Sequence, residues 1–330
     1  MLINNKDFKE FVGNKNTTDE LLGLINKSKA TGAYMLKGPE GLGKAYLAKI
    51  LANNLLNIKG KTYENNIHPD LFLIDNNLDN KKQISVEKVR GIFSFLSKTS
   101  LSSLGKIVII DAIDNINTFG HNSLLKVLEE LKSANIIFII NHSSSFIPAT
   151  IQSRCKVLKF RPLSKIEVKN VLVSKYSKLS EEDIDFYVNA SNGSIGYAIK
   201  QISYDMIHKH NEVLKILKDI KIKKDKVLDI VDLFNDAKTK DKNFNSFSEL
   251  FISLLSKCLK IKSDIKVTYL SLSEQNFLKD LGEFLTYNDI FYLIDDLKSL
   301  QNNLNIYNMS PTNSIISFLS NFKFIIDNKI

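Results

Sequence analysis

The stretch GPEGLGKA at residues 38–45 decides how the first half of this 330-residue sequence folds. It follows an apolar run at 33–37 and precedes a helical pattern at 44–56. Between a strand and a helix, glycines let backbone N–H groups converge on phosphate, and a lysine reaches the terminal phosphates. The candidate phosphate-binding residues are Gly38, Gly41, Gly43, Lys44 and Ala45.

Two positions near this loop lack the side chains that hydrolysis requires. The residue after the lysine is normally Ser or Thr, whose hydroxyl binds Mg²⁺, but Ala45 has no side-chain oxygen. The run at 107–111 ends in Asp111, interpreted as a vestigial metal-side carboxylate, and Ala112 follows where a carboxylate usually orients water. Asp114 is not expected to substitute, because the chain is leaving the strand there. The sequence predicts at most weak binding of ATP or ADP, little ATPase activity and no metal; an ordinary ATPase with substitute ligands is the alternative.

Five apolar runs separated by helical patterns predict a parallel sheet with helices on both faces. The expected strands are residues 33–37, 71–75, 107–111, 136–141 and 156–160. After Pro162 the strand patterns stop. We therefore predict an α/β P-loop domain at 1–162, a small helical lid at 163–204 and an all-α domain at 205–330.

Composition limits the class of protein. The formal charge is +9, and only Arg90, Arg154 and Arg161 are arginines among the 45 basic residues. The excess of lysine has two readings, a solvated surface or a basic face for a polyanion. No apolar run approaches the ~20 residues that span a bilayer, so we expect a cytoplasmic protein without a membrane partner. Two cysteines are too few for a disulfide framework.

The scarcity of arginine makes each one a candidate for a role that lysine cannot fill, namely planar, bidentate contact with an anion. Arg154 lies in the tripeptide Ser153-Arg154-Cys155, after the fourth expected strand. Upstream is the segment NSLLKVLEE at 122–130, and His68-Pro69-Asp70 precedes the second strand.

Together these motifs resemble the clamp loaders of DNA replication, a branch of the AAA+ ATPases, over residues 10–200. The resemblance implies that Arg154, beside Ser153, acts as an arginine finger in the ATP site of a neighbouring subunit. It implies as partners the gamma/tau ATPase subunits, the delta subunit, a sliding clamp, and primed DNA through the assembled complex. The last helical domain would then form the collar that joins the subunits.

Two departures from the family pattern bear on the site, and one assignment stays open. Residues 51–70 contain no cysteine, so no zinc is expected. Gly196 occupies the position where catalytic members carry a nucleotide-sensing arginine in the lid. The sensor at the end of the fourth strand is Asn141 or His142, and the sequence does not choose between them.

Two enzyme hypotheses compete with a non-hydrolysing assembly subunit. A self-sufficient AAA+ ATPase, such as a clamp-loader motor subunit, is disfavoured by Ala45, Ala112 and Gly196. A P-loop nucleotide kinase would need several substrate-binding arginines, and the chain has three in all.

Overall fold

The computed structural model describes residues 11–27, 31–56, 68–75, 84–101, 105–131, 134–142, 147–218, 226–235, 240–267, 272–307 and 309–328. The chain divides into two compact units, Met1–Lys200 and Gln201–Ile330. This division agrees with a helical C-terminal part. The finer predicted boundaries at 162 and 204 stay predictions.

The first unit is built on a five-stranded parallel sheet of order β2-β3-β4-β1-β5. The strands are β1 (Gly32–Lys37), β2 (Leu71–Asp75), β3 (Ile107–Asp111), β4 (Ile136–Asn141) and β5 (Lys156–Lys159). All five predicted strands are confirmed, with ends shifted by at most one residue. Near-continuous apolar runs form them because both faces of the sheet are covered.

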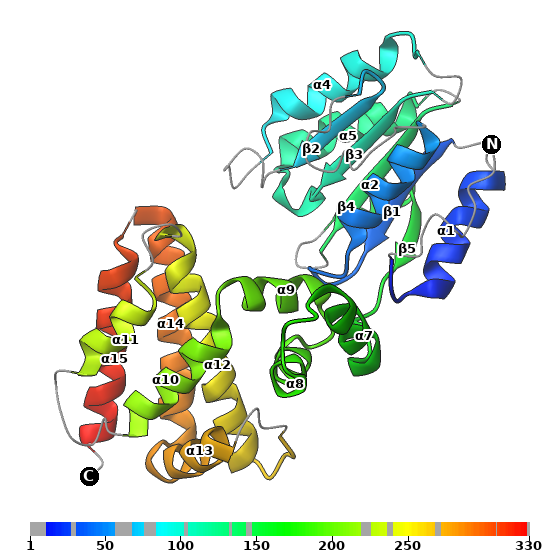
Figure 1. Cartoon of the computed structure of the whole chain (residues 1–330). Coiled ribbons are helices and arrows are strands. Elements are labelled where there is room, and N and C mark those ends of the chain that lie inside the picture. Colours follow the sequence, from blue (N-terminus) through cyan, green and yellow to red (C-terminus); the bar gives the residue numbers. More distant parts are fainter. Residues whose placement is uncertain are drawn as a thin grey trace. The chain divides into compact units, whose positions relative to one another are not determined.

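Two separate hydrophobic cores cover the faces of the sheet. Helices α1 (Lys15–Lys27) and α2 (Lys44–Leu55) pack on one face, and α4 (Val86–Ser97) and α5 (Thr118–Glu129) pack on the other (Figure 1). Alternate strand residues divide between the cores: Ile109 and Phe138 face α2, and Val108 and Ile139 face α4 and α5. The predicted α/β fold class is confirmed.

Shorter elements complete the first unit. The 3₁₀ turn η2 (Ile113–Asn115) follows β3, and α6 (Ala149–Gln152) precedes β5. The predicted helical lid corresponds to α7 (Lys165–Lys175), α8 (Glu181–Ala190) and α9 (Ile195–Ser203). The break between α8 and α9 falls at Asn192 and Gly193, as expected, and both have positive φ.

The second unit is helical in its described part. It contains α10 (Met206–Lys218), α11 (Lys226–Leu233), α12 (Lys240–Lys262), α13 (Leu272–Phe284), α14 (Tyr287–Tyr307) and α15 (Pro311–Asp327). Buried phenylalanines from α12 and α15, among them Phe247, Phe251 and Phe318, form its aromatic centre. Phe291 and Tyr292 of α14 are more than half exposed, so they are not part of that core.

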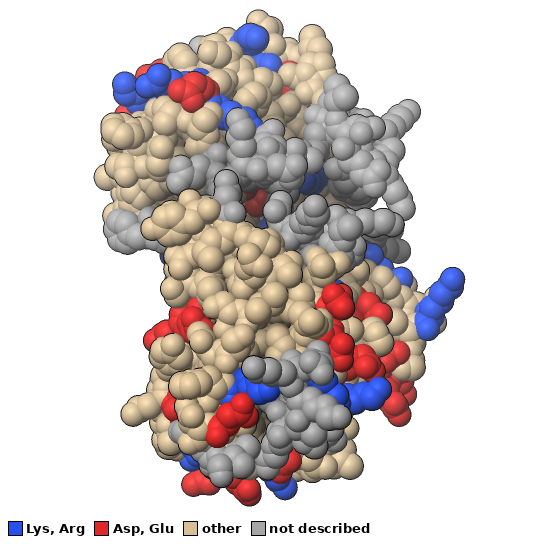
Figure 2. All heavy atoms as spheres, turned by 90° about the vertical axis from the view of Figure 1, so that its left-hand side faces the viewer, with Lys and Arg blue, Asp and Glu red and all other residues tan. Residues whose placement is uncertain are grey.

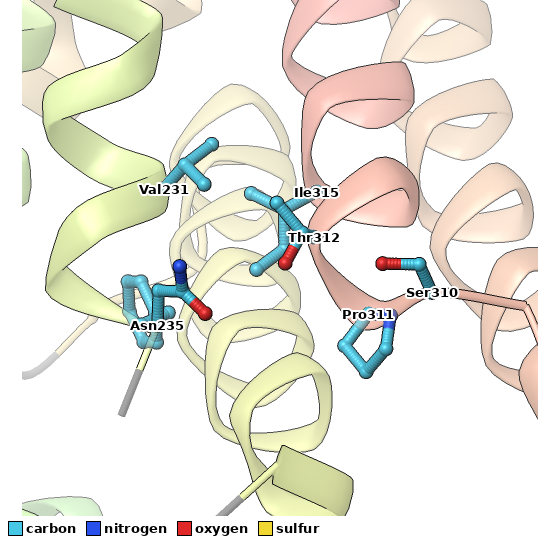
Figure 3. Close-up of a pocket in the computed structure, with 7 residues that line it drawn as sticks. Val231, Asn235, Ser310, Pro311, Thr312 and Ile315 are labelled. Carbon is cyan, nitrogen blue, oxygen red and sulfur yellow. The ribbon is translucent and has the colours of Figure 1, made fainter. Parts of the chain in front are cut away.

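A pocket of about 280 Å³ lies in the second unit between α11 and the start of α15 (Figure 3). It is lined by Val231, Phe234, Asn235, Ser310, Pro311, Thr312 and Ile315. None of these side chains titrates near neutral pH, so the lining offers no acid or base that could activate the hydroxyl groups of Ser310 and Thr312.

Candidate functional site

The phosphate loop connects β1 to α2, as the sequence predicted. Gly43 stands at the N-cap of α2 with φ of 80°, a left-handed conformation that glycine adopts at little cost. Gly38 lies against Phe160, the residue after β5, and an added Cβ would come within 2.4 Å of the Phe160 carbonyl oxygen. Ala45 contributes only a methyl group, which packs against the core on the α2 face of the sheet.

Lys44 is held inside its own loop. Its Nζ donates to the carbonyl oxygen of Gly38 at 2.8 Å and also to that of Pro39. Burial lowers the pKa of Lys44 to about 8, although the negative charges of Asp111 and Asp114 oppose this shift. The loop glycines, the start of α2 and this ammonium group fit a phosphate. The missing hydroxyl at residue 45 does not fit phosphate-bound Mg²⁺.

Asp111 lies at the end of β3, close to the phosphate loop. Burial, with the like charge of Asp75, raises the pKa of Asp111 to about 6. Nε2 of His142 is 3.7 Å from its Oδ1. Burial, with the positive charge of Lys44, lowers the pKa of His142, so its ring is neutral at pH 7. This contact is therefore not an ion pair at neutral pH.

Asp114 joins the ends of β3 and β4. Its Oδ1 accepts a hydrogen bond from Nδ2 of Asn141 at 3.1 Å, and its Oδ2 accepts from the backbone N–H of His142 at 2.8 Å. Both carboxylate oxygens are thus used within the fold. Sequence reasoning missed this link, because it depends on β3 and β4 being neighbours.

The two candidates for the sensor position differ in their surroundings. The Asn141 side chain is fully buried and points to Asp114, whereas the His142 ring lies beside Asp111. Within the described residues, Oδ1 of Asn141 and Nδ1 of His142 are buried without a hydrogen-bond partner. Two unsatisfied polar atoms at this edge are consistent with a place where a ligand or water binds.

The start of α9 is attached to the phosphate loop by two hydrogen bonds to backbone carbonyl oxygens. The N–H of Gly196 donates to the carbonyl oxygen of Gly41 at 2.7 Å, and Oγ of Ser194 donates to that of Glu40 at 3.1 Å. A Cβ on Gly196 would lie 2.8 Å from Cα of Gly41. Any side chain at residue 196, an arginine included, would push the lid away from the loop.

This close approach predicts that Gly196→Ala is destabilising by about 1–3 kcal/mol, because overpacking forces backbone shifts. Gly23→Ala is the matched control, since no atom lies within 4 Å of the added Cβ. Alanine there should be neutral or stabilising by ~0.5–1 kcal/mol. Urea unfolding and hydrogen exchange of the α9 amides measure both effects. Equal behaviour of the two variants would contradict the attachment of the lid.

Arg154 is not among the residues that surround the phosphate loop. Its NH1 donates to the carbonyl oxygen of Thr150 at 2.9 Å, and its NH2 forms an ion pair with Oε1 of Glu129 at 2.7 Å. The side chains of Arg154 and Glu129 are 37% and 52% exposed, so this pair lies at the surface. Oγ of Ser153 donates to the same Thr150 carbonyl at 3.0 Å. The guanidinium is thus accessible to a partner.

Cys155 follows Arg154 in the chain and packs against the core on the α4 and α5 face of the sheet. Burial raises the pKa of its thiol to about 12. The thiolate is the reactive form of cysteine, so this residue is chemically inert near neutral pH.

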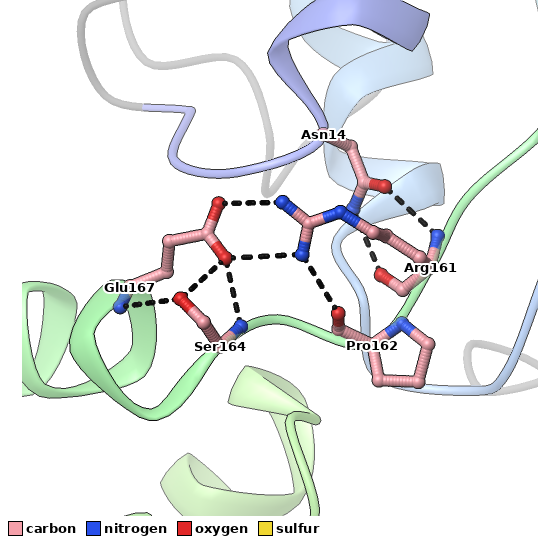
Figure 4. A network of polar contacts seen from close by, with 5 residues as sticks. All are labelled: Asn14, Arg161, Pro162, Ser164 and Glu167. Carbon is pink, nitrogen blue, oxygen red and sulfur yellow. Dashed lines mark hydrogen bonds and ion pairs between the residues drawn. The ribbon is translucent and has the colours of Figure 1, made fainter.

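Arg161 makes the bidentate contact expected of a retained arginine (Figure 4). NH1 and NH2 reach the two carboxylate oxygens of Glu167 at 3.2 and 3.3 Å. Asn14 clamps the backbone of Arg161 through its Oδ1 and Nδ2, and Ser164 caps α7. The network joins the residues before α1, the end of β5 and α7, and it positions the lid without chemistry of its own.

The described residues hold no group of three or more His, Cys, Asp or Glu side chains that could bind a metal ion. Residues 57–67, where part of the zinc motif of the family would fall, lie outside the described residues. None of the described helices is long and apolar enough to cross a bilayer.

Comparisons with known proteins agree with this geometry. A family model described as "DNA polymerase III, delta subunit" matches residues 13–164. The DNA polymerase III subunit delta' of Bacillus subtilis is 30% identical over 166 residues, covering 47% of this chain and 50% of the relative. The corresponding subunit of Pseudomonas aeruginosa is 31% identical over 144 residues, covering 40% and 44%.

More distant relatives extend over more of the chain. The gamma subunit of Buchnera aphidicola subsp. Schizaphis graminum is 26% identical over 223 residues, covering 64% of this chain and 61% of the relative. The crystal structure of a gamma subunit-related protein from Thermotoga maritima has a TM-score of 0.54 at 17% identity, covering 95% of this chain and all of that one. At this identity the structural likeness concerns the fold alone.

The parallel sheet, the phosphate loop and these relatives make the chain similar to AAA+ proteins of the clamp-loader class. Within that class the chain is delta-prime-like. It spans about half the length of the curated delta' relatives that it matches.

Proposed function

We propose that this chain is the delta-prime subunit of a DNA polymerase III clamp loader and that it hydrolyses little ATP itself. Its role is to supply Arg154 to the ATP site of a neighbouring ATPase subunit. The observation that carries the proposal is a contrast within this chain. Arg154 is exposed, whereas the phosphate loop and the end of β3 lack the side-chain groups that hold Mg²⁺ and orient water.

The chemistry of such a finger is electrostatic. Negative charge develops on the phosphoryl oxygens during transfer, and a guanidinium that donates N–H groups to them lowers the barrier. Arginine suits this role because it presents several donors in a rigid plane and stays charged at all accessible pH values. Arg154 would act from the edge of its own subunit, with Ser153 beside it.

The phosphate loop of this chain is better suited to a structural role than to ATP hydrolysis. Lys44 donates to its own loop, Gly196 is attached to Gly41, and Ala45 and Ala112 have no side-chain oxygen. ATP or ADP would therefore bind weakly at Gly38, Gly41, Gly43 and Lys44, without a hydrolytic role for Asp111. The alternative is a self-sufficient AAA+ ATPase, which rests on the complete glycine-lysine loop.

The proposal names partners by the assembly in which such a subunit works. These are the gamma/tau ATPase subunits and delta, the sliding clamp, and primed DNA through the assembled complex, in the cytoplasm. The second unit would form the collar, with exposed Phe291 and Tyr292 available to neighbours. On the face drawn in Figure 2, the basic side chains of the described residues lie in small groups, several of them beside acidic ones.

Reconstitution tests the proposal. The purified chain is mixed with gamma/tau and delta, and DNA-stimulated ATPase and clamp loading are measured with and without it. We expect both activities to require the chain, and the isolated chain to show neither. Steady ATP turnover by the isolated chain would instead favour the self-sufficient ATPase.

Restoring only one of the two missing side-chain groups should not create ATPase activity. Ala45→Ser supplies a hydroxyl for Mg²⁺, but Ala112 still leaves the attacking water without a base. We expect the isolated variant to turn over ATP no faster than the parent chain, as measured by phosphate release. The double change Ala45→Ser with Ala112→Glu is the comparison. Appreciable turnover by the single variant would show that Ala112 is not limiting.

A further inference from the structure

The Arg154 guanidinium is held by two elements of its own subunit. Thr150, which binds NH1, belongs to α6, and Glu129, which binds NH2, is the last residue of α5. Helices α5 and α6 pack against each other. Both terminal nitrogens of the side chain are therefore anchored to one body.

These anchors leave donors for a third group. A guanidinium carries five N–H bonds, and the contacts with Thr150 and Glu129 use one on each terminal nitrogen. The remaining donors belong to a side chain that is 37% exposed. The guanidinium can bind an anion from a docked subunit while it keeps both anchors.

We propose that Glu129 is a positioning residue for Arg154: its carboxylate orients the guanidinium so that the remaining N–H groups meet phosphate oxygens in a neighbouring subunit. The inference rests on the proposed function, in which Arg154 acts in trans. It adds to that function a role for Glu129, the last residue of α5.

The ion pair between Arg154 and Glu129 is strong enough to orient the guanidinium but too weak to keep it from a phosphate. An ion pair between exposed groups is weak, so it does not withhold arginine from a charge-assisted, bidentate phosphate contact. An unanchored arginine samples many rotamers, and this freedom must be lost before it can meet a phosphate. Glu129 removes part of that cost in advance.

The experiment uses the assembled loader with all its subunits and compares Glu129→Ala with Glu130→Ala. The two residues are adjacent at the end of α5, so both changes remove a carboxylate from the same helix C-terminus. We expect Glu129→Ala to lower kcat for ATP about tenfold and to leave KM within about twofold, since only the transition-state contact changes. Glu129→Gln, which keeps an acceptor but no charge, should fall between Ala and the parent. Glu130→Ala should match the parent.

Non-additivity separates positioning from a general structural effect. A lysine at residue 154 lacks the two terminal nitrogens, so adding Glu129→Ala to Arg154→Lys should change kcat less than twofold. Urea unfolding of Glu129→Ala and Glu130→Ala should coincide.

Each remaining outcome is decisive. If Arg154→Ala lowers turnover but Glu129→Ala equals Glu130→Ala, the positioning role is wrong and the proposed function stands. If Glu129→Ala raises kcat, the carboxylate restrains the finger, and the inference is equally wrong. If Arg154→Ala itself changes nothing, the proposed function fails first.

Discussion

Replacing Arg154 with alanine should lower ATP turnover of the assembled clamp loader by ~10³-fold or more, the range in which arginine fingers act. The isolated chain should keep its fold, because the side chain is at the surface and its pair with Glu129 is weak. Loss of rate without loss of folding would identify a group that acts on a neighbour.

The measurement is steady-state ATPase of the reconstituted complex with clamp and primed DNA present. Arg90→Ala is the control, since Arg90 is also an exposed arginine and lies on α4. Size-exclusion chromatography should report the same assembly for both variants. Equal turnover in the Arg154 and Arg90 variants would rule out the finger.

Asp70→Ala should destabilise the first unit by about 3–5 kcal/mol, the usual cost of leaving one member of a buried ion pair alone. Asp70 is fully buried, and its Oδ1 is 3.3 Å from Nζ of Lys106, which is also buried. The same carboxylate accepts a hydrogen bond from the N–H of Leu101 at 2.9 Å. The His68-Pro69-Asp70 turn therefore secures the start of β2 and β3.

Urea unfolding tests this prediction against Asp19→Ala, which removes an exposed carboxylate from α1 and should stay within about 0.5 kcal/mol of the parent. The double change Asp70→Leu with Lys106→Met replaces the pair with apolar side chains and should recover much of the loss. A small effect of Asp70→Ala would mean that water reaches Lys106.

Sequence patterns were sufficient where the cause is local. Strand residues such as Ile109 and Phe138 are apolar because both faces of the sheet are covered, and the alternation of runs made this visible. The loop at 38–45 follows from its glycines and its place between β1 and α2. The absence of a side-chain oxygen at Ala45 and Ala112 is a property of residue type and needed no structure.

Contacts between distant segments could not be derived in the same way. Asn141 bonds to Asp114 only because β3 and β4 are neighbours, an order that no local pattern encodes. Residue type does not distinguish Phe291 from Phe251, yet Phe291 is exposed and Phe251 is buried. The packing of the helices in the second unit decides which face of each helix is covered.

The sequence by itself indicated the class of this protein and the absence of a hydroxyl at residue 45 and of a carboxylate at residue 112. Both depend on which atoms each side chain carries. Only the tertiary structure decided how the rest is arranged. It placed Gly196 against Gly41 and Glu129 beside Arg154, since such contacts arise only when folding brings together segments that are apart in the chain.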